Sequence, residues 1–250
     1  MIRFFLGLLL FLFSLLVNGQ VKQNHVIAGE VTKLVASMPL DIQVDATSDS
    51  NTVRVEGTQE DLNHVSIRQT GSTLYVDMNV KKTKRSIRDN RAKVFISQSK
   101  IVDYYVSTTA NVRVNGRVQG GTVVLKAEAA AYITADFTAT NVTINLDSAS
   151  KYKGDITAKN SKVNLDSASS ATVTGDVENL TINVDSAAKF DGKNLKAKFV
   201  KVEADSMGKA EVYPIESLNA YADSMGRVIY YNTPKELKKY TDSMGSVKSN

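Results

Sequence analysis

Asp147-Ser148-Ala149-Ser150 is the stretch that decides the fold, because five further copies of it follow along the chain. Their first residues are Asp166, Asp185, Asp205, Asp223 and Asp242. In the last three copies Met-Gly replaces the final two residues. Successive aspartates are separated by 19, 19, 20, 18 and 19 residues. A constant period near 20 residues is typical of a solenoid, in which each repeat forms one coil on the coil before it.

Apolar residues keep a fixed register to this motif. Three alternating positions precede each Asp-Ser pair, as in Val142, Ile144 and Leu146, and alternation with period two places them on one face of a strand. Another apolar column lies five residues after the Asp position of each coil, which Ser107 and Glu128 occupy in the first two coils. Its residues are Val112, Ile133, Tyr152, Ala171, Phe190, Ala210, Val228 and Val247. The pattern predicts an all-β fold, a right-handed parallel β-helix of about eight coils over residues 105–250.

Residues 20–104 lack the repeat but alternate like strands. Leu40–Val44 has a period of two, and Gln69–Ser72 separates two short apolar runs as a hairpin turn does. We expect a smaller, mostly antiparallel β region that packs on or caps the solenoid. At the other end, Lys239 and Thr241 replace apolar residues in the last triplet, which predicts a C-terminal cap.

Composition limits the function classes. The chain has 250 residues, 42% of them apolar, and its formal charge of +5 is too mild to indicate a nucleic-acid partner. It contains no cysteine, which excludes a disulfide framework, a thiol nucleophile and a Cys-ligated metal.

Residues 1–19 have the pattern of a cleaved signal peptide. Arg3 is followed by 14 apolar residues, Phe4–Val17, which is short for a membrane span. No second apolar segment follows, so we expect no transmembrane segment after signal removal. An exported chain without disulfides indicates the periplasm, the outer-membrane surface or the outside of a Gram-negative bacterium.

The repeated aspartates allow three interpretations. In the first they are structural, because Asp and Ser side chains bond the nearby backbone in turns. In the second, carboxylates of adjacent coils share Ca²⁺. In the third they contact a glycan or act in catalysis, although a feature copied on every coil is weak evidence for one catalytic centre.

Outward-facing columns suggest a ligand face or a subunit interface. Asn145, Asn164 and Asn183 lie two residues before successive aspartates and predict an amide ladder. The C-terminal end is rich in tyrosine, which either packs at the edge of the rod, stacks on sugar rings or forms an interface. The residues of this candidate face are Tyr213, Tyr221, Tyr230, Tyr231 and Tyr240.

A basic segment is the other candidate site. Its residues are Lys81, Lys82, Lys84, Arg85, Arg88, Arg91 and Lys93, and it is either a solvated loop or a patch for an anionic polysaccharide or lipid phosphate. The two histidines, His25 and His64, have no spacing typical of a metal site or a catalytic triad.

The chain resembles the secreted bacterial family described as putative auto-transporter adhesin, head GIN domain. The resemblance runs from about Val31 to Tyr231 and includes Leu40–Val44, Gly71–Val76, Val94–Ser97 and the coil motif, where the family often carries other small residues. It implies a β-helix-like fold of stacked short strands and a cell-envelope location. It carries no catalytic residues over to this chain.

We therefore expect a non-enzymatic, exported envelope protein that binds a glycan or a surface protein, or that has a structural role. The alternative is a polysaccharide-acting β-helix enzyme, a lyase or hydrolase. Such an enzyme needs an acidic cluster and a basic residue in a groove, whereas a smooth rod favours the binding protein.

Overall fold

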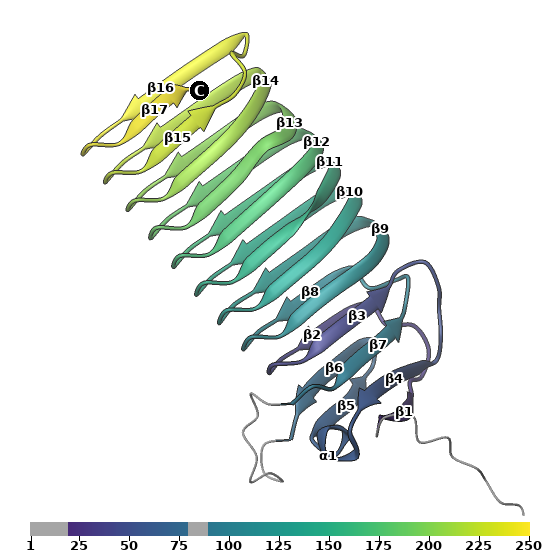
Figure 1. Cartoon of the computed structure of the whole chain (residues 1–250). Coiled ribbons are helices and arrows are strands. Elements are labelled where there is room, and N and C mark those ends of the chain that lie inside the picture. The colour runs from purple at the N-terminus through teal and green to yellow at the C-terminus, as the bar shows by residue number, and fades with distance from the viewer. Residues whose placement is uncertain (1–19, 80–89) are drawn as a thin grey trace, which may run out of the picture.

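The structure is a computed structural model that describes residues 20–79 and 90–250. The predicted signal peptide, residues 1–19, lies outside the described residues. The chain winds into a long stack of flattened coils, with the N-terminal strands at one end and the C-terminal strands at the other (Figure 1). The prediction of an all-β solenoid of about eight coils, preceded by a smaller antiparallel region, is confirmed.

In the described part of the chain, nine short elements precede the solenoid strands. The first group is β1 (Val21–Val26), β2 (Lys33–Ala36), β3 (Asp41–Asp45), β4 (Thr52–Gly57), α1 (Gln59–Leu62), β5 (Val65–Thr70), β6 (Thr73–Met78), β7 (Lys93–Ser97) and β8 (Asp103–Val106). The second is β9 (Asn111–Ala127), β10 (Tyr132–Leu146), β11 (Lys151–Leu165), β12 (Ser170–Val184), β13 (Lys189–Ala204), β14 (Lys209–Ala222), β15 (Arg227–Tyr230), β16 (Glu236–Thr241) and β17 (Ser246–Ser249).

Each solenoid coil has one narrow and one rounded edge (Figure 1). The narrow edge is the Asp-Ser turn, and at the rounded edge one continuous strand such as β10 bends back across the stack. β10 and β11 pair in parallel, with Ile133 opposite Tyr152 and Leu146 opposite Leu165. The bend therefore divides each coil into two half-strands that belong to opposite walls of the rod.

The N-terminal region adds to the stack in an order that differs from the chain order. Its antiparallel pairs are β1–β4, β4–β7 and β5–β6. β2 and β3, however, pair in parallel with β6 and β7 on one side and with β8 and β9 on the other. The predicted hairpin is β5–β6, and Gly71 supplies the positive φ of its turn (57°). The domain boundary at residues 104 and 105 stays a prediction.

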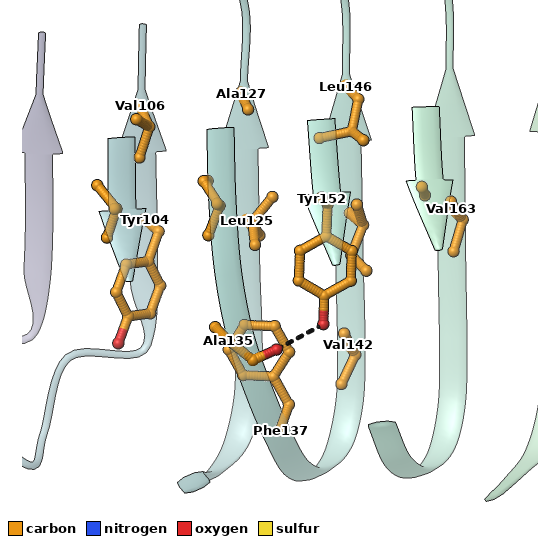
Figure 2. Packing of buried hydrophobic residues seen from close by; sticks show 14 of the residues in the cluster. Tyr104, Val106, Leu125, Ala127, Ala135, Phe137, Val142, Leu146, Tyr152 and Val163 are labelled. Atoms are coloured by element: carbon orange, nitrogen blue, oxygen red, sulfur yellow. Dashed lines mark hydrogen bonds between the residues drawn. The ribbon is translucent and has the colours of Figure 1, made fainter. Parts of the chain in front are cut away.

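The two walls enclose a continuous apolar core. All predicted inward positions from β9 to β14 are buried, and the core also holds aromatic rings (Figure 2). The ring of Phe137 lies 6.0 Å from that of Tyr152 at an interplanar angle of 12°. The Tyr152 hydroxyl donates to the carbonyl oxygen of Ala135 (2.9 Å), so its polar end is satisfied in the core.

Glycines make room for these rings. A Cβ on Gly154 would overlap the Ala135 carbonyl oxygen and the Tyr152 hydroxyl. In the same way, a Cβ on Gly192 would overlap the Phe190 ring. A glycine two residues after an inward aromatic residue is thus part of the packing.

The C-terminal end differs from the interior coils. The predicted cap is a further coil, β16 and β17, that stacks on β14 and β15. Lys239, at an inward position, is exposed, and its Nζ lies 3.4 Å from the Tyr230 hydroxyl. An inward-pointing charge on an edge strand discourages another strand from pairing there.

Candidate binding surface

The Asp-Ser turns form one straight column along the narrow edge. Their second and third residues both have positive φ, as in a type I′ turn; for Ser148 and Ala149 the values are 52° and 61°. The Asp147 Oδ1 accepts a hydrogen bond from the Ser148 N–H at 2.6 Å, and the same bond recurs at Asp166, Asp185, Asp205, Asp223 and Asp242. Each aspartate thus holds its own turn.

Backbone hydrogen bonds also join one turn to the next. The Ala149 N–H donates to the Ser167 carbonyl (2.9 Å), and the Ser150 hydroxyl donates to the Ala127 carbonyl (3.0 Å). A hydrogen bond from the Ser167 hydroxyl is the largest cause of the lowered pKa of Asp147. Each aspartate of the column is therefore held by the N–H donor of its own turn, and Asp147 also by the hydroxyl of the next turn.

Two amide ladders run along one wall of the rod. In the first, which the sequence predicts, Asn164 Nδ2 donates to Asn145 Oδ1 (2.7 Å) and Asn183 Nδ2 donates to Asn164 Oδ1 (2.8 Å). The second, which the sequence analysis missed, joins Asn141, Asn160 and Asn179 at 2.9 and 3.0 Å. Its signal was present, because these asparagines share the same period of 19 residues.

The first amide ladder and the aspartate column border one shallow groove of about 310 Å³. Its polar lining consists of Asn145, Asn164, Asn183, Asp147, Asp166, Asp185, Glu128 and Lys126. Four carboxylates against one ammonium make the groove electronegative. We call this groove, with the amide ladder, the amide groove.

The tyrosines named from the sequence separate into three environments. Tyr221 and Tyr240 lie opposite each other on β14 and β16 and are 40% and 54% exposed. Their column is that of the amide ladder, through Asn183, Glu203 and Tyr221. Tyr230 is buried, and the Tyr231 hydroxyl donates to Glu211 (2.9 Å), while Tyr213 is half-buried. Only Tyr221 and Tyr240 thus extend the amide groove.

The basic segment is described only in part. Lys81, Lys82, Lys84, Arg85 and Arg88 lie outside the described residues, so the anion patch stays a prediction. Arg91 and Lys93 are exposed and border a hollow of about 370 Å³ with Asp41 and Asn111. His25 lies in β1, and His64 is buried just before β5.

A polar hollow of about 740 Å³, which the sequence does not predict, lies at the N-terminal end. Its lining includes Asn24, Gln43, Asp45, Arg54 and Phe95, from four different strands. The Arg54 guanidinium carbon lies 4.5 Å from the centre of the Phe95 ring. This hollow depends on the unusual strand order of the N-terminal region, which no sequence period reveals.

A charged cluster at the rounded edge combines an acidic and a basic residue, as the enzyme alternative requires. Arg117 pairs with Asp155 and also donates to the Phe137 carbonyl (3.0 Å). Thr174 donates to the other Asp155 oxygen (2.7 Å), and the hydrogen bond from Arg117 is the largest cause of the lowered pKa of Asp155. These groups bond one another across coils, which is a structural role.

Among residues 20–79 and 90–250, no three His, Asp or Glu side chains are grouped so that they could hold a metal ion. The Ca²⁺ hypothesis for the aspartate column stays a prediction. In the same part of the chain no helix has the length and hydropathy needed to cross a membrane.

Solved structures from two Parabacteroides species share this architecture. A putative adhesin from Parabacteroides merdae has 14% identity and a TM-score of 0.80, over 93% of this chain and 97% of that one. A putative adhesin from Parabacteroides distasonis has 18% identity and a TM-score of 0.82, over 92% and 97%. A protein from the same species described as a putative lipid binding protein has 14% identity and a TM-score of 0.82, over 93% and 97%.

These likenesses show the shared fold, since all three identities are low. Comparison with curated proteins finds no match. The model of one family, described as putative auto-transporter adhesin, head GIN domain, matches residues 30–234. This match covers most of the chain and includes both the N-terminal strands and the coils, and we conclude that the protein belongs to that adhesin family.

Proposed function

We propose that the protein is an exported, non-enzymatic, adhesin-like module of the bacterial envelope that binds an extended glycan along the amide groove. One observation carries the proposal. A single outward column offers the amides of Asn145, Asn164 and Asn183, then the Glu203 carboxylate, and then the exposed rings of Tyr221 and Tyr240. Family membership supports the adhesin-like role and the envelope location.

The chemistry of the column suits a sugar chain. Within the ladder Asn164 both donates and accepts, whereas Asn145 only accepts and Asn183 only donates, which leaves further donor and acceptor capacity for hydroxyl groups. Tyrosine rings offer apolar faces to sugar rings. Coils recur about every 4.8 Å, so the column offers donors and acceptors at regular steps along the rod.

The charge of the groove narrows the ligand class. Asp147, Asp166 and Asp185 with Glu128 outnumber Lys126, so an acidic polysaccharide would be repelled. A neutral glycan, or one that carries amino sugars, fits the groove better. The uniform coils offer many weak, repeated contacts rather than one deep pocket.

The enzyme alternative has one supporting observation, the presence of aspartates and a lysine in the same groove. A glycosidase, however, needs one carboxyl with a raised pKa to act as general acid. The pKa of Asp147 is lowered instead, chiefly by the Ser167 hydroxyl. The charge of the groove also disfavours the acidic polymers on which lyases act.

A glycan array probed with the mature chain tests the proposal. We expect binding to neutral or amino-sugar polymers, lost in the Tyr221→Ala, Tyr240→Ala double variant and retained in Tyr132→Ala, which changes an outward tyrosine of the opposite wall. Binding that survives the double variant would place the ligand elsewhere, and failure to bind any glycan would contradict the proposal. Release of new reducing ends from a bound polymer would favour the enzyme.

A further inference from the structure

Three methionines occupy one equivalent position in successive turns. Met207, Met225 and Met244 are each the third residue of an Asp-Ser-Met-Gly turn, with φ values of 66°, 65° and 67°. The Met207 N–H donates to the Ser224 carbonyl (3.1 Å) and the Met225 N–H to the Ser243 carbonyl (3.2 Å). Equal backbone angles in stacked turns give the three Cα–Cβ bonds the same direction. The side chains therefore form a column, the thioether column, with steps of about 4.8 Å.

The fold does not require methionine at these positions. Ala149, Ala168 and Ala187 occupy the same place in the preceding turns, with φ values of 61°, 61° and 62°. A positive φ is unfavourable for a residue with a long side chain, whereas asparagine and glycine adopt it more readily. The choice of methionine at all three turns therefore points to the chemistry of its side chain.

The thioethers are open to solvent. Met207, Met225 and Met244 are 59%, 53% and 81% exposed, whereas Met78 is buried in the core. Three exposed methionines in one line are not explained by burial of apolar surface. Each methionine side chain has three rotatable bonds, so the outer two can bend toward the middle one.

The neighbouring groups suit a cation. Asp205, Asp223 and Asp242 belong to the same three turns and contribute negative potential, although each binds a serine N–H through Oδ1. Arg227 and Lys209 follow within the next strands, and the Lys209 ammonium is paired with Glu211 (3.2 Å). Thioethers are soft ligands that select Cu(I), whereas hard ions such as Ca²⁺ prefer oxygen.

We propose that Met207, Met225 and Met244 form a binding site for one soft monovalent cation of the Cu(I) class. Met225 is the central ligand, and the flanking methionines close on the ion from the turns on either side. Binding exchanges solvent ligands for thioethers and transfers no electron. The site borders the Tyr221 and Tyr240 end of the proposed glycan surface, because the Tyr221 hydroxyl lies 3.4 Å from Asp223 Oδ2 in the turn of Met225, but ion binding does not depend on the proposed glycan binding.

The test is a titration of the mature chain with Ag⁺, a redox-stable probe of the same class, repeated with Cu(I) under anaerobic conditions against a competing chelator. We expect one ion per thioether column, and three methionine methyl NMR signals that shift while those of Met38 and Met78 stay in place. Met225→Ala should weaken binding about tenfold or more. The triple alanine variant, which copies the residues of the preceding turns, should abolish it.

Two further measurements test the site, one with added methionines and one across a range of pH. Introducing Ala149→Met, Ala168→Met and Ala187→Met builds a second column, so the number of bound ions should rise from one to two. Because thioethers do not titrate, the affinity should be constant between about pH 5 and pH 8, whereas a histidine site would weaken as pH falls. The proposal would be overturned if the wild-type chain did not bind the ion, or if the triple alanine variant bound it unchanged. It would also be overturned if only the Met38 or Met78 signals shifted, or if the added methionines bound no further ion.

Discussion

Two kinds of turn share the narrow edge of the solenoid, and their difference separates what the fold demands from what it leaves free. The Ala turns begin at Asp147, Asp166 and Asp185, and the Met turns begin at Asp205, Asp223 and Asp242. Both kinds have two residues with positive φ and the same Asp-to-Ser N–H bond. They differ at the third and fourth residues. Asp and Ser are thus the part that these six turns share, and the third residue is available for function.

The cores behind these turns also differ. Phe137, Tyr152 and Phe190 fill the coils around the Ala turns, whereas Ala204, Ala210 and Ala220 occupy inward positions near the Met turns. In a solenoid each coil contacts mainly its neighbours, so stability is close to a sum over adjacent coils. The two halves should therefore respond separately to damage in the core.

The largest effect is expected from Phe137→Ala. The change removes a fully buried ring and its contacts with Tyr152 and Tyr104, which should lower the free energy of unfolding by about 3–5 kcal/mol. Chemical denaturation measures the loss. Hydrogen exchange should increase in β9–β11 and stay low in β14. An equal increase in both halves would show that the rod unfolds as one unit and would remove the distinction.

A smaller loss is expected from Gly226→Ala, at the fourth position of a Met turn. An added Cβ would overlap the Ala204 carbonyl oxygen. The Met turns are tighter than the Ala turns, since the Gly208 nitrogen lies 2.6 Å from the Asp205 carbonyl oxygen, whereas the Ser150 nitrogen lies 3.2 Å from that of Asp147. We expect a cost of about 1–3 kcal/mol by chemical denaturation.

The matched control uses the same position in an Ala turn. Ala188 already carries a Cβ there, so Ala188→Gly should lose only about 0.5–1 kcal/mol through added chain freedom. If Gly226→Ala proved as stable as the wild-type chain, the two turn types would be interchangeable and the glycine would have no packing role.

The sequence predicted the features that repeat. The inward triplets, the apolar column at plus five and the Asn145 ladder all depend on a period of about 19 residues, and each lies where the register placed it. Positive φ at two consecutive non-glycine residues was not predicted, because serine and alanine rarely adopt it. Only the hydrogen bonds between stacked turns make that conformation favourable.

Features that break the repeat could not be predicted. β2 and β3 insert between β6–β7 and β8–β9, and no local pattern encodes a stacking order that differs from chain order. The hollow around Arg54 and Phe95 follows from that insertion. Tyr230 alternates with Val228 and so points inward, which the sequence pattern indicates. It was nevertheless assigned to the ligand face because other tyrosines surround it in the sequence.

The pH dependence of stability should differ between the wild-type chain, in which Asp155 is paired, and the Asp155→Asn variant. Because the pKa of Asp155 in the folded chain is lowered, mainly by the hydrogen bond from Arg117, its contribution is present at neutral pH. It is lost as pH falls below about 4, the range of an unfolded aspartate. Asp155→Asn should therefore lower the free energy of unfolding at pH 7 by less than about 1 kcal/mol, since the pair is partly exposed. It should also make the acid limb, the fall in that free energy at low pH, less steep.

Chemical denaturation of both chains between about pH 5 and pH 2 measures that limb. Arg117→Met is the matched variant, because it removes the same ion pair from the other side. An acid limb as steep as that of the wild-type chain in both variants would show that Asp155 is not stabilised by Arg117.

The smallest effect is expected where the two turn types differ most in sequence. Replacing Met207, Met225 and Met244 by alanine should change the free energy of unfolding by no more than about 0.5 kcal/mol, because the side chains are exposed and alanine adopts the same φ in the Ala turns. Thermal and chemical denaturation of the triple variant give the value. A loss above about 1 kcal/mol would mean that the thioethers pack on the rod, and the third position would then belong to the structural part of the motif. A change within the expected range, together with lost Ag⁺ binding, would separate function from fold at a single position of the repeat.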